Sequence, residues 1–129
     1  LMPRPLLSET QTASPARDAI HHFHRGVVED VQSAVVSSDV VVVGMRHNPH
    51  VRHARKRLSQ AGIPFTYLGY GSYLSKWKER LAIKLWSGWP TYPQIFVQGV
   101  LVGGDSDLKA MMNDGSFQTL LDAGRPPLG

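Results

Sequence analysis

Apolar positions along this chain alternate between helical spacing and short unbroken runs. Over 18–36 they recur at three and four residues, which predicts an amphipathic helix. The β-branched run over 40–45 has no polar interruption and predicts a central strand buried on both faces. A helix is expected next over 49–61, with Asn48 as its N-cap and Pro49 in its first turn.

The second half of the chain predicts further strands and helices in alternation. Helical spacing of apolar residues predicts an amphipathic helix that packs its stripe, including Trp77, into the core; the stripe is Leu74, Trp77, Leu81 and Leu85. The other expected elements are a strand over 64–68, a hairpin of 95–97 and 100–102, and short helices over 106–112 and 116–122. This order predicts an α/β fold, in which two parallel strands and an antiparallel hairpin form a four-stranded mixed sheet flanked by helices.

Length and composition indicate one folded domain. The chain has 129 residues, 42% of them hydrophobic, which is enough for a single core. We expect 1–17 to be a flexible arm, 18–124 the folded domain and 125–129 a frayed tail, because prolines and weak periodicity mark both ends. No apolar run approaches the roughly 20 residues of a membrane helix, and no signal-peptide core is visible, so we expect a soluble, cytoplasmic protein with no membrane partner.

Charge and cysteine content narrow the chemistry. The net charge of +4 comes mostly from 52–57 and 76–84, which resemble solvated helix faces. Nucleic acid is disfavoured as a partner because basic and aromatic residues are not interleaved, although a nucleic-acid or acidic-partner module using the 52–57 face is a distant alternative. The chain has no cysteine, which excludes disulfides, thiolate metal ligands and thiol catalysis.

The stretch over 89–108 holds the most specific local pattern. A Tyr92-Pro93 bond precedes the hairpin, at a position where the tertiary amide lowers the cost of the cis isomer. The hairpin leads into the segment 103–107, Gly-Gly-Asp-Ser-Asp, which offers unhindered backbone amides and capping side chains at the start of a helix. Such a turn can hold an anion.

The segment 89–94, Trp-Pro-Thr-Tyr-Pro-Gln, followed by Gly103-Gly104, resembles the glutaredoxins, most of all the monothiol class whose active site reads Cys-Gly-Phe-Ser. The other matching residues are Arg80, Ile83, Lys84 and Ser87. The resemblance covers roughly 27–121 and implies a thioredoxin fold. It also implies a glutathione-binding set, namely Arg46, Arg80, Thr91, Tyr92, Pro93, Gly104, Asp105 and Ser106.

The resemblance also implies which part of glutathione, a tripeptide, each of these residues would contact. The backbone of Tyr92 would pair with the cysteinyl residue, and the turn at Asp105 and Ser106 would hold the γ-glutamyl carboxylate. Arg46 and Arg80 would contact the other end, since a ligand with two carboxylates needs cations and free amides.

The chain departs from the family at the reactive position. The nucleophilic cysteine would fall on Asn48, and the resolving position of the dithiol class on Val51. An amide cannot perform thiol-disulfide exchange, and a [2Fe-2S] cluster uses one cysteine ligand per protomer, so the sequence argues against both. We therefore expect a binding module for glutathione, a similar small anion or a protein partner, with no required cofactor. The alternative is a glutathione-dependent disulfide oxidoreductase or an iron-sulfur-related monothiol glutaredoxin in cell redox homeostasis.

The histidines form two groups along the sequence. They are His21, His22 and His24 in the first helix, and His47, His50 and His53 around the start of the second. His50 and His53 lie one turn apart, a spacing compatible with metal binding. No cysteine or well-placed carboxylate is evident in the sequence to complete either set, so no metal site is predicted.

Overall fold

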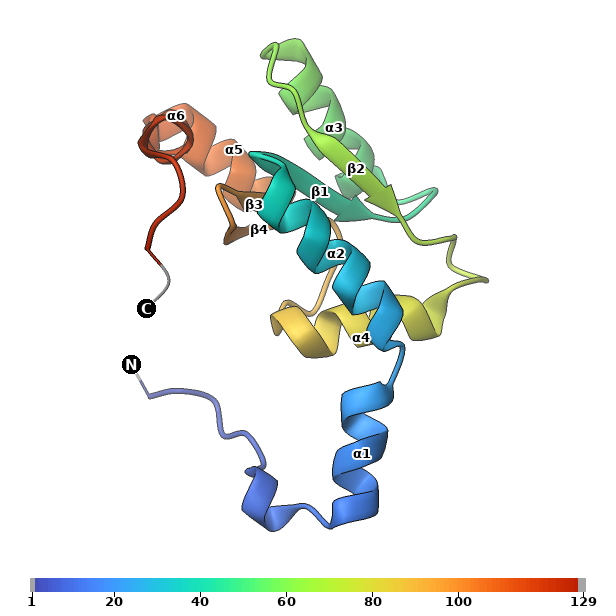
Figure 1. Ribbon diagram of the computed structural model, residues 1–129. Helices are drawn as coiled ribbons and strands as arrows, with labels where there is room; N and C mark the ends of the chain where they lie inside the picture. The colour runs from blue at the N-terminus through green and yellow to red at the C-terminus, as the bar shows by residue number, and fades with distance from the viewer. Residues whose placement is uncertain (1, 128–129) are drawn as a thin grey trace.

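The computed structural model describes residues 2–127 and is built on a four-stranded sheet in the order β2-β1-β3-β4 (Figure 1). β1 (Val40–Gly44) pairs in parallel with β2 (Thr66–Gly69) and antiparallel with β3 (Gln94–Val97). β3 and β4 (Val100–Gly103) form the antiparallel hairpin. The predicted mixed sheet, with two parallel strands extended by a hairpin, is confirmed.

Helices cover both faces of this sheet (Figure 1). Their bounds are η1 (Glu9–Gln11), α1 (Ser14–His22), α2 (Arg25–Ser37), α3 (Pro49–Gln60), α4 (Trp77–Ser87), α5 (Asp105–Asp114) and α6 (Ser116–Ala123). α2 and α4 pack on one face, and α3, α5 and α6 pack on the other. No helix within residues 2–127 combines the length and apolar composition that a membrane crossing requires.

The valine run of β1 divides the core into two clusters. Val41 and Val43 contact the α2 and α4 side, whereas Val40 and Val42 contact the α3, α5 and α6 side. Successive side chains of a strand point to opposite faces, so a continuous apolar run fills both layers at once. The prediction that this strand is central and buried on both faces is confirmed.

The single helix predicted over 18–36 is two helices. His24 has a φ of 46°, in the left-handed region, and separates α1 from α2. α2 buries Val31 and Val35, whereas α1 buries no residue and extends beyond the sheet (Figure 1). The apolar spacing continues across the break, and a single left-handed residue leaves no trace in a periodicity.

The flexible arm and the frayed tail stay predictions, and the structure adds one local observation at each end of the chain. Part of the expected arm is helical, since η1 lies within 1–17 and α1 begins at Ser14. In the expected tail, the Arg125 guanidinium donates a hydrogen bond to the Ser38 carbonyl oxygen at 3.1 Å. Residue 1 and residues 128–129 lie outside the described part of the chain.

The prediction of which α4 face is buried is wrong, because the predicted apolar stripe faces mostly outward. Trp77 is 57% exposed and Leu85 is 69% exposed, and Leu74 precedes the helix altogether. The helix instead buries Arg80, Ala82 and Ile83. Both faces of this segment carry apolar residues at helical spacing, so the period identifies a helix without deciding which face meets the core.

Candidate functional site

Asn48, where the resemblance would place a nucleophilic cysteine, caps α3. Its Oδ1 accepts hydrogen bonds from the backbone amides of His50 at 2.9 Å and Val51 at 3.2 Å. Only 9% of Asn48 is exposed, so its capping oxygen has little access to water. The first amides of a helix have no partner within it, and a side-chain oxygen at the N-cap satisfies them. The predicted N-cap is confirmed.

The start of α3 forms one side of the candidate site. The segment at Tyr92 and Pro93, just before β3, forms the second side. The Asn48 Nδ2 lies 3.5 Å from the Tyr92 carbonyl oxygen, which joins the start of α3 to this segment. The Tyr92-Pro93 peptide bond is cis. The Tyr92 hydroxyl donates to the Arg80 carbonyl oxygen at 2.5 Å, and burial raises the pKa of this phenol above its usual value, since ionisation would place a charge away from water.

Arg80 is buried and holds the loop that precedes α4. Its Nη1 donates to the carbonyl oxygens of Tyr70 at 2.8 Å, Ser72 at 2.7 Å and Ser75 at 2.5 Å. Nη1 carries two N–H groups, so one of them is shared between two of these carbonyl oxygens, and together they fix the path of this loop. The Nη1 end of this side chain is therefore committed to the protein itself.

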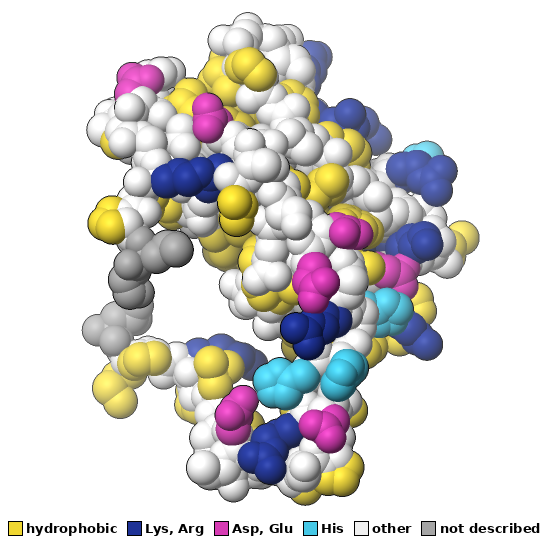
Figure 2. Space-filling model, viewed as in Figure 1, with side chains coloured by type: hydrophobic (Ala, Val, Ile, Leu, Met, Phe, Trp, Pro, Cys, Tyr) yellow, Lys and Arg dark blue, Asp and Glu magenta, His cyan; other side chains and the backbone are white. Residues whose placement is uncertain are grey.

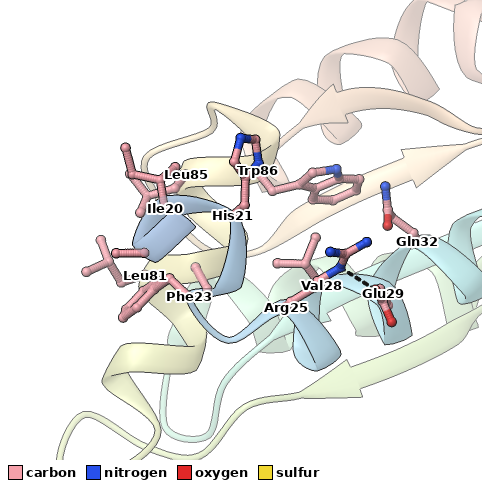
Figure 3. A pocket seen from close by; sticks show the side chains of 12 residues that line it. Ile20, His21, Phe23, Arg25, Val28, Glu29, Gln32, Leu81, Leu85 and Trp86 are labelled. Carbon is pink, nitrogen blue, oxygen red and sulfur yellow. Dashed lines mark hydrogen bonds and ion pairs between the residues drawn. The ribbon is translucent and has the colours of Figure 1, made fainter. Parts of the chain in front are cut away.

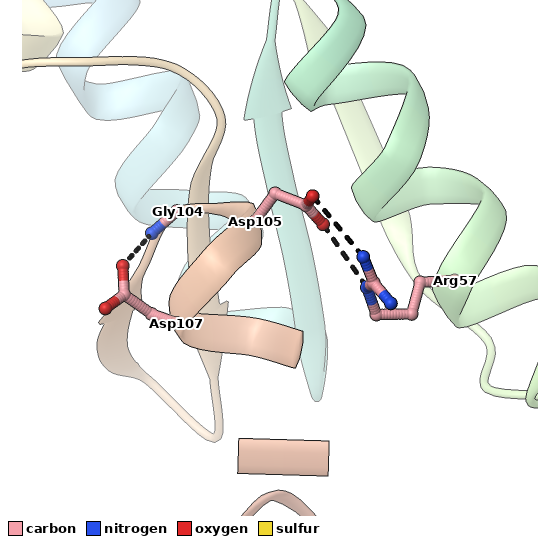
Figure 4. Close-up of polar contacts among 4 residues, drawn as sticks. All are labelled: Arg57, Gly104, Asp105 and Asp107. Carbon is pink, nitrogen blue, oxygen red and sulfur yellow. Dashed lines mark hydrogen bonds and ion pairs between the residues drawn. The ribbon is translucent and has the colours of Figure 1, made fainter. Parts of the chain in front are cut away.

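The third side of the site is the start of α5 (Figure 4). The Gly104 amide donates to the Asp107 Oδ2 at 2.9 Å, so Asp107 supplies the capping carboxylate. Asp105 turns instead toward α3, where its Oδ1 and Oδ2 accept from Arg57 Nε at 3.3 Å and Nη2 at 3.4 Å. This two-pronged ion pair compensates the charge of Asp105 beside the amides of the first helical turn.

The fold brings most of the predicted set to adjoining segments. A side chain at Gly104 would place its Cβ 3.7 Å from the Pro93 carbonyl oxygen, so the α5 start adjoins the segment before β3. Thr91 and Ser106 are exposed on these same two segments. Arg46 is exposed at the end of β1, where its amide donates to the Gly71 carbonyl oxygen at 2.7 Å.

The sequence analysis missed a carboxylate beside two histidines of α3. The ligand atoms of His50, His53 and Asp105 all lie within 4.8 Å of one another. The expectation that no well-placed carboxylate completes this histidine set is therefore wrong. No local signal could have found it, because Asp105 lies on a different helix and reaches α3 only through tertiary packing.

A separate apolar groove lies between α1, α2 and α4 (Figure 3). It has a volume of about 770 Å³, and its apolar lining includes Ile20, Phe23, Val28, Leu81 and Trp86. None of the residues of the predicted glutathione set lines it. The groove accounts for part of the apolar surface that α1 and α4 leave exposed.

Surface charge on the viewed face of the molecule is mixed. Figure 2 shows Lys and Arg side chains interspersed with Asp and Glu side chains, rather than gathered into one basic surface. A groove that tracks a nucleic-acid backbone needs continuous positive charge. This face therefore lacks the charge pattern of a nucleic-acid surface.

Comparison with known proteins agrees with the architecture. No family model matches the chain. A crystal structure of a buckwheat glutaredoxin-glutathione complex superposes with a TM-score of 0.65 and 20% identity, covering 77% of this chain and 90% of that one. At that identity the likeness shows the fold, and the predicted thioredoxin fold is confirmed.

Sequence relatives show the family. A monothiol glutaredoxin of Synechocystis sp. is 37% identical over 65 residues, which are 50% of this chain and 58% of that protein. A glutaredoxin-like protein of Dictyostelium discoideum is 46% identical over 98 residues, which cover 76% of this chain and 80% of that protein. The chain therefore belongs to the glutaredoxin family, as a member with no cysteine.

Proposed function

We propose that this protein is a glutaredoxin-like binding module that holds glutathione, or a similar small anion, without performing thiol-disulfide exchange. The observation that carries the proposal is Asn48, an amide seated at the start of α3 as its cap. A glutaredoxin needs a thiolate at this place, where a helix N-terminus lowers the thiol pKa and the sulfur attacks a mixed disulfide. A carboxamide offers hydrogen bonds only, so a bound glutathione would remain a ligand.

The proposed groove lies between the starts of α3 and α5 and the segment before β3. Tyr92 would pair by its backbone with the middle of the tripeptide, and the first-turn amides at Asp105 and Ser106 would receive the γ-glutamyl carboxylate. Arg46, exposed at the end of β1, would provide the cation for the other carboxylate. The pairing of Asp105 with Arg57 supports this assignment, because it reduces the repulsion of an incoming anion.

One further consideration supports a ligand of this kind, and the same groove also suits an alternative one. The buckwheat glutaredoxin of the same fold was crystallised as a glutathione complex. An extended peptide of a protein partner could pair with the same backbone edge at Tyr92, since this mode of recognition uses main-chain hydrogen bonds. We leave Arg80 out of the proposed contacts because its Nη1 holds three carbonyl groups of the protein.

Titration with reduced glutathione, followed by amide chemical shifts, tests the binding proposal. We expect saturable shifts at Arg46, Tyr92 and Ser106 at millimolar glutathione. Arg46→Ala should weaken binding, whereas Arg17→Ala, which removes the same charge from α1, should leave it unchanged. Absence of saturable shifts in the unaltered protein would refute the proposal.

A second experiment tests the absence of exchange chemistry. The unaltered protein should not reduce a glutathione mixed disulfide above a no-protein control. Asn48→Cys should gain this activity if the rest of the site is intact, whereas Asn48→Ser, which keeps a capping oxygen, should not. Turnover by the unaltered protein would favour the alternative, a glutathione-dependent oxidoreductase.

A further inference from the structure

We propose that His50, His53 and Asp105 form a binding site for a divalent transition-metal ion of the Zn²⁺ type. Their potential ligand atoms lie within 4.8 Å of one another, although the residues come from two different helices. Imidazole nitrogens together with a carboxylate oxygen are a donor set that suits such ions. The site uses side chains that the proposed glutathione groove does not use.

The two histidines are arranged by the first turns of α3. They lie three residues apart and therefore project from one face of the helix. Their ring centroids are 6.5 Å apart and the rings are perpendicular, so one ring presents its edge to the other. Metal–nitrogen bonds of about 2.0–2.1 Å place two ligand nitrogens roughly 3 to 3.5 Å apart. Both side chains are exposed and can reach that separation by small rotations.

Asp105 supplies a carboxylate that is already held in position. Its side chain is only 11% exposed, and Arg57 donates one hydrogen bond to each of the two carboxylate oxygens. A carboxylate has about four lone-pair positions, so this pairing leaves acceptor capacity on both oxygens. Carboxylates that ligate metals are commonly held by such hydrogen bonds. Arg57 is therefore a positioning residue, whose positive charge also moderates the attraction of Asp105 for a cation.

The arrangement provides three protein ligands and leaves the remaining coordination positions open. Such sites complete their coordination with water or another small ligand. The metal ion would bind the side-chain oxygen atoms of Asp105, whereas the proposed glutathione contact uses the backbone amide of this residue. Asp105→Asn should therefore weaken metal binding and retain the amide, which makes failure of the two proposals distinguishable.

The test is a titration of the full chain, without an affinity tag, against Zn²⁺ by calorimetry and against Co²⁺ by visible absorption. We expect one ion per chain with saturable, micromolar binding. His50→Gln, His53→Gln and Asp105→Asn should each weaken it by about tenfold or more. His22→Gln is the matched control, because His22 is an exposed histidine at the end of α1, and it should leave binding unchanged.

Paramagnetic broadening by Co²⁺ gives an independent readout in the unaltered protein. Amide signals should broaden first around His50, His53 and Asp105. Lack of saturable binding would overturn the proposal. Binding that His50→Gln and His53→Gln leave unchanged, or broadening centred on His21 and His22, would also overturn it, because the ion would then sit on the N-terminal histidines.

Discussion

Replacing Asn48 by alanine should destabilise the fold by removing the cap of α3. The side chain satisfies two backbone amides, at 2.9 and 3.2 Å, and alanine satisfies neither. Loss of an N-cap typically costs about 1 kcal/mol, within a range of roughly 0.5–2 kcal/mol. Since the residue is only 9% exposed, water cannot easily replace the lost acceptor, which favours the upper half of that range.

The contact to Tyr92 changes this magnitude little. The Asn48 Nδ2 lies 3.5 Å from the Tyr92 carbonyl oxygen, near the limit for a hydrogen bond, so its loss should add only a few tenths of a kcal/mol. We therefore expect a loss of about 1.5 kcal/mol in the free energy of unfolding. In a domain of this size that corresponds to a fall in melting temperature of about 5 °C.

Urea unfolding followed by far-ultraviolet circular dichroism measures this loss directly. The midpoint should fall while the slope stays constant, which shows that stability rather than compactness has changed. Asn48→Ser keeps a capping oxygen and should lose only a few tenths of a kcal/mol. Asn113→Ala removes an exposed asparagine from the end of α5 and should stay within about 0.5 kcal/mol of the unaltered protein. If Asn48→Ala is as stable as Asn113→Ala, the capping argument is wrong.

The same reasoning links the stability of the helix start to the proposed loss of thiol-disulfide exchange. Asn48→Cys should gain exchange activity while losing stability nearly as Asn48→Ala does, because sulfur is a weak acceptor for the helix amides. The asparagine thus stabilises the helix start at a position where a thiol would react. An Asn48→Cys variant as stable as the unaltered protein would contradict this account.

Four further predictions concern the contacts around the site. Tyr92→Phe leaves the buried Arg80 carbonyl group without its hydroxyl donor and should cost about 1–2 kcal/mol in urea unfolding. Because burial raises the pKa of Tyr92 above its usual value of 10.0, the stability tied to its neutral phenol is retained below pH 10 and lost as pH rises beyond it; this loss, measured by unfolding at alkaline pH, should be smaller in Tyr92→Phe. Arg80→Met should cost about 3 kcal/mol or more, since three carbonyl groups lose their donor, and Arg80→Lys should recover only part of that loss. A double-mutant cycle of Arg57→Ala and Asp105→Asn should give a coupling of about 0.5–1 kcal/mol, which falls as salt is added, because the pair is partly exposed.

The features that the sequence predicts correctly are local ones. The cap at Asn48 follows from an asparagine directly before a proline, and the hairpin follows from two apolar runs around Gln98-Gly99. In both features the residues that interact are close together in the sequence. The motif over 89–104 supplied the family resemblance, because its matches are spaced along one short stretch.

Sequence reasoning failed where the outcome depended on contacts between elements. The stripe through Trp77 and Leu81 had the spacing of a buried face, yet α4 turns Ala82 and Ile83 inward. The contact of Arg80 with a ligand stays a prediction, and only the structure shows that its Nη1 donates to carbonyl oxygens of the loop before α4. The position of a guanidinium at the end of a long side chain depends on the nearby backbone.

By itself, the sequence determined the order of the strands and of the helices between and after them, the central β1 strand and the absence of cysteine. Those properties depend on residue type and on spacing between neighbours, and the absence of cysteine needs no structure to establish. Only the tertiary structure decided that α1 separates from α2 at His24, and that Asp105 turns to Arg57 beside His50 and His53. The break at His24 is a local backbone conformation that a periodicity does not record. The approach of Asp105 to Arg57 and the histidines arises because packing brings together residues distant along the chain, and local periodicity carries no record of which distant side chains will meet.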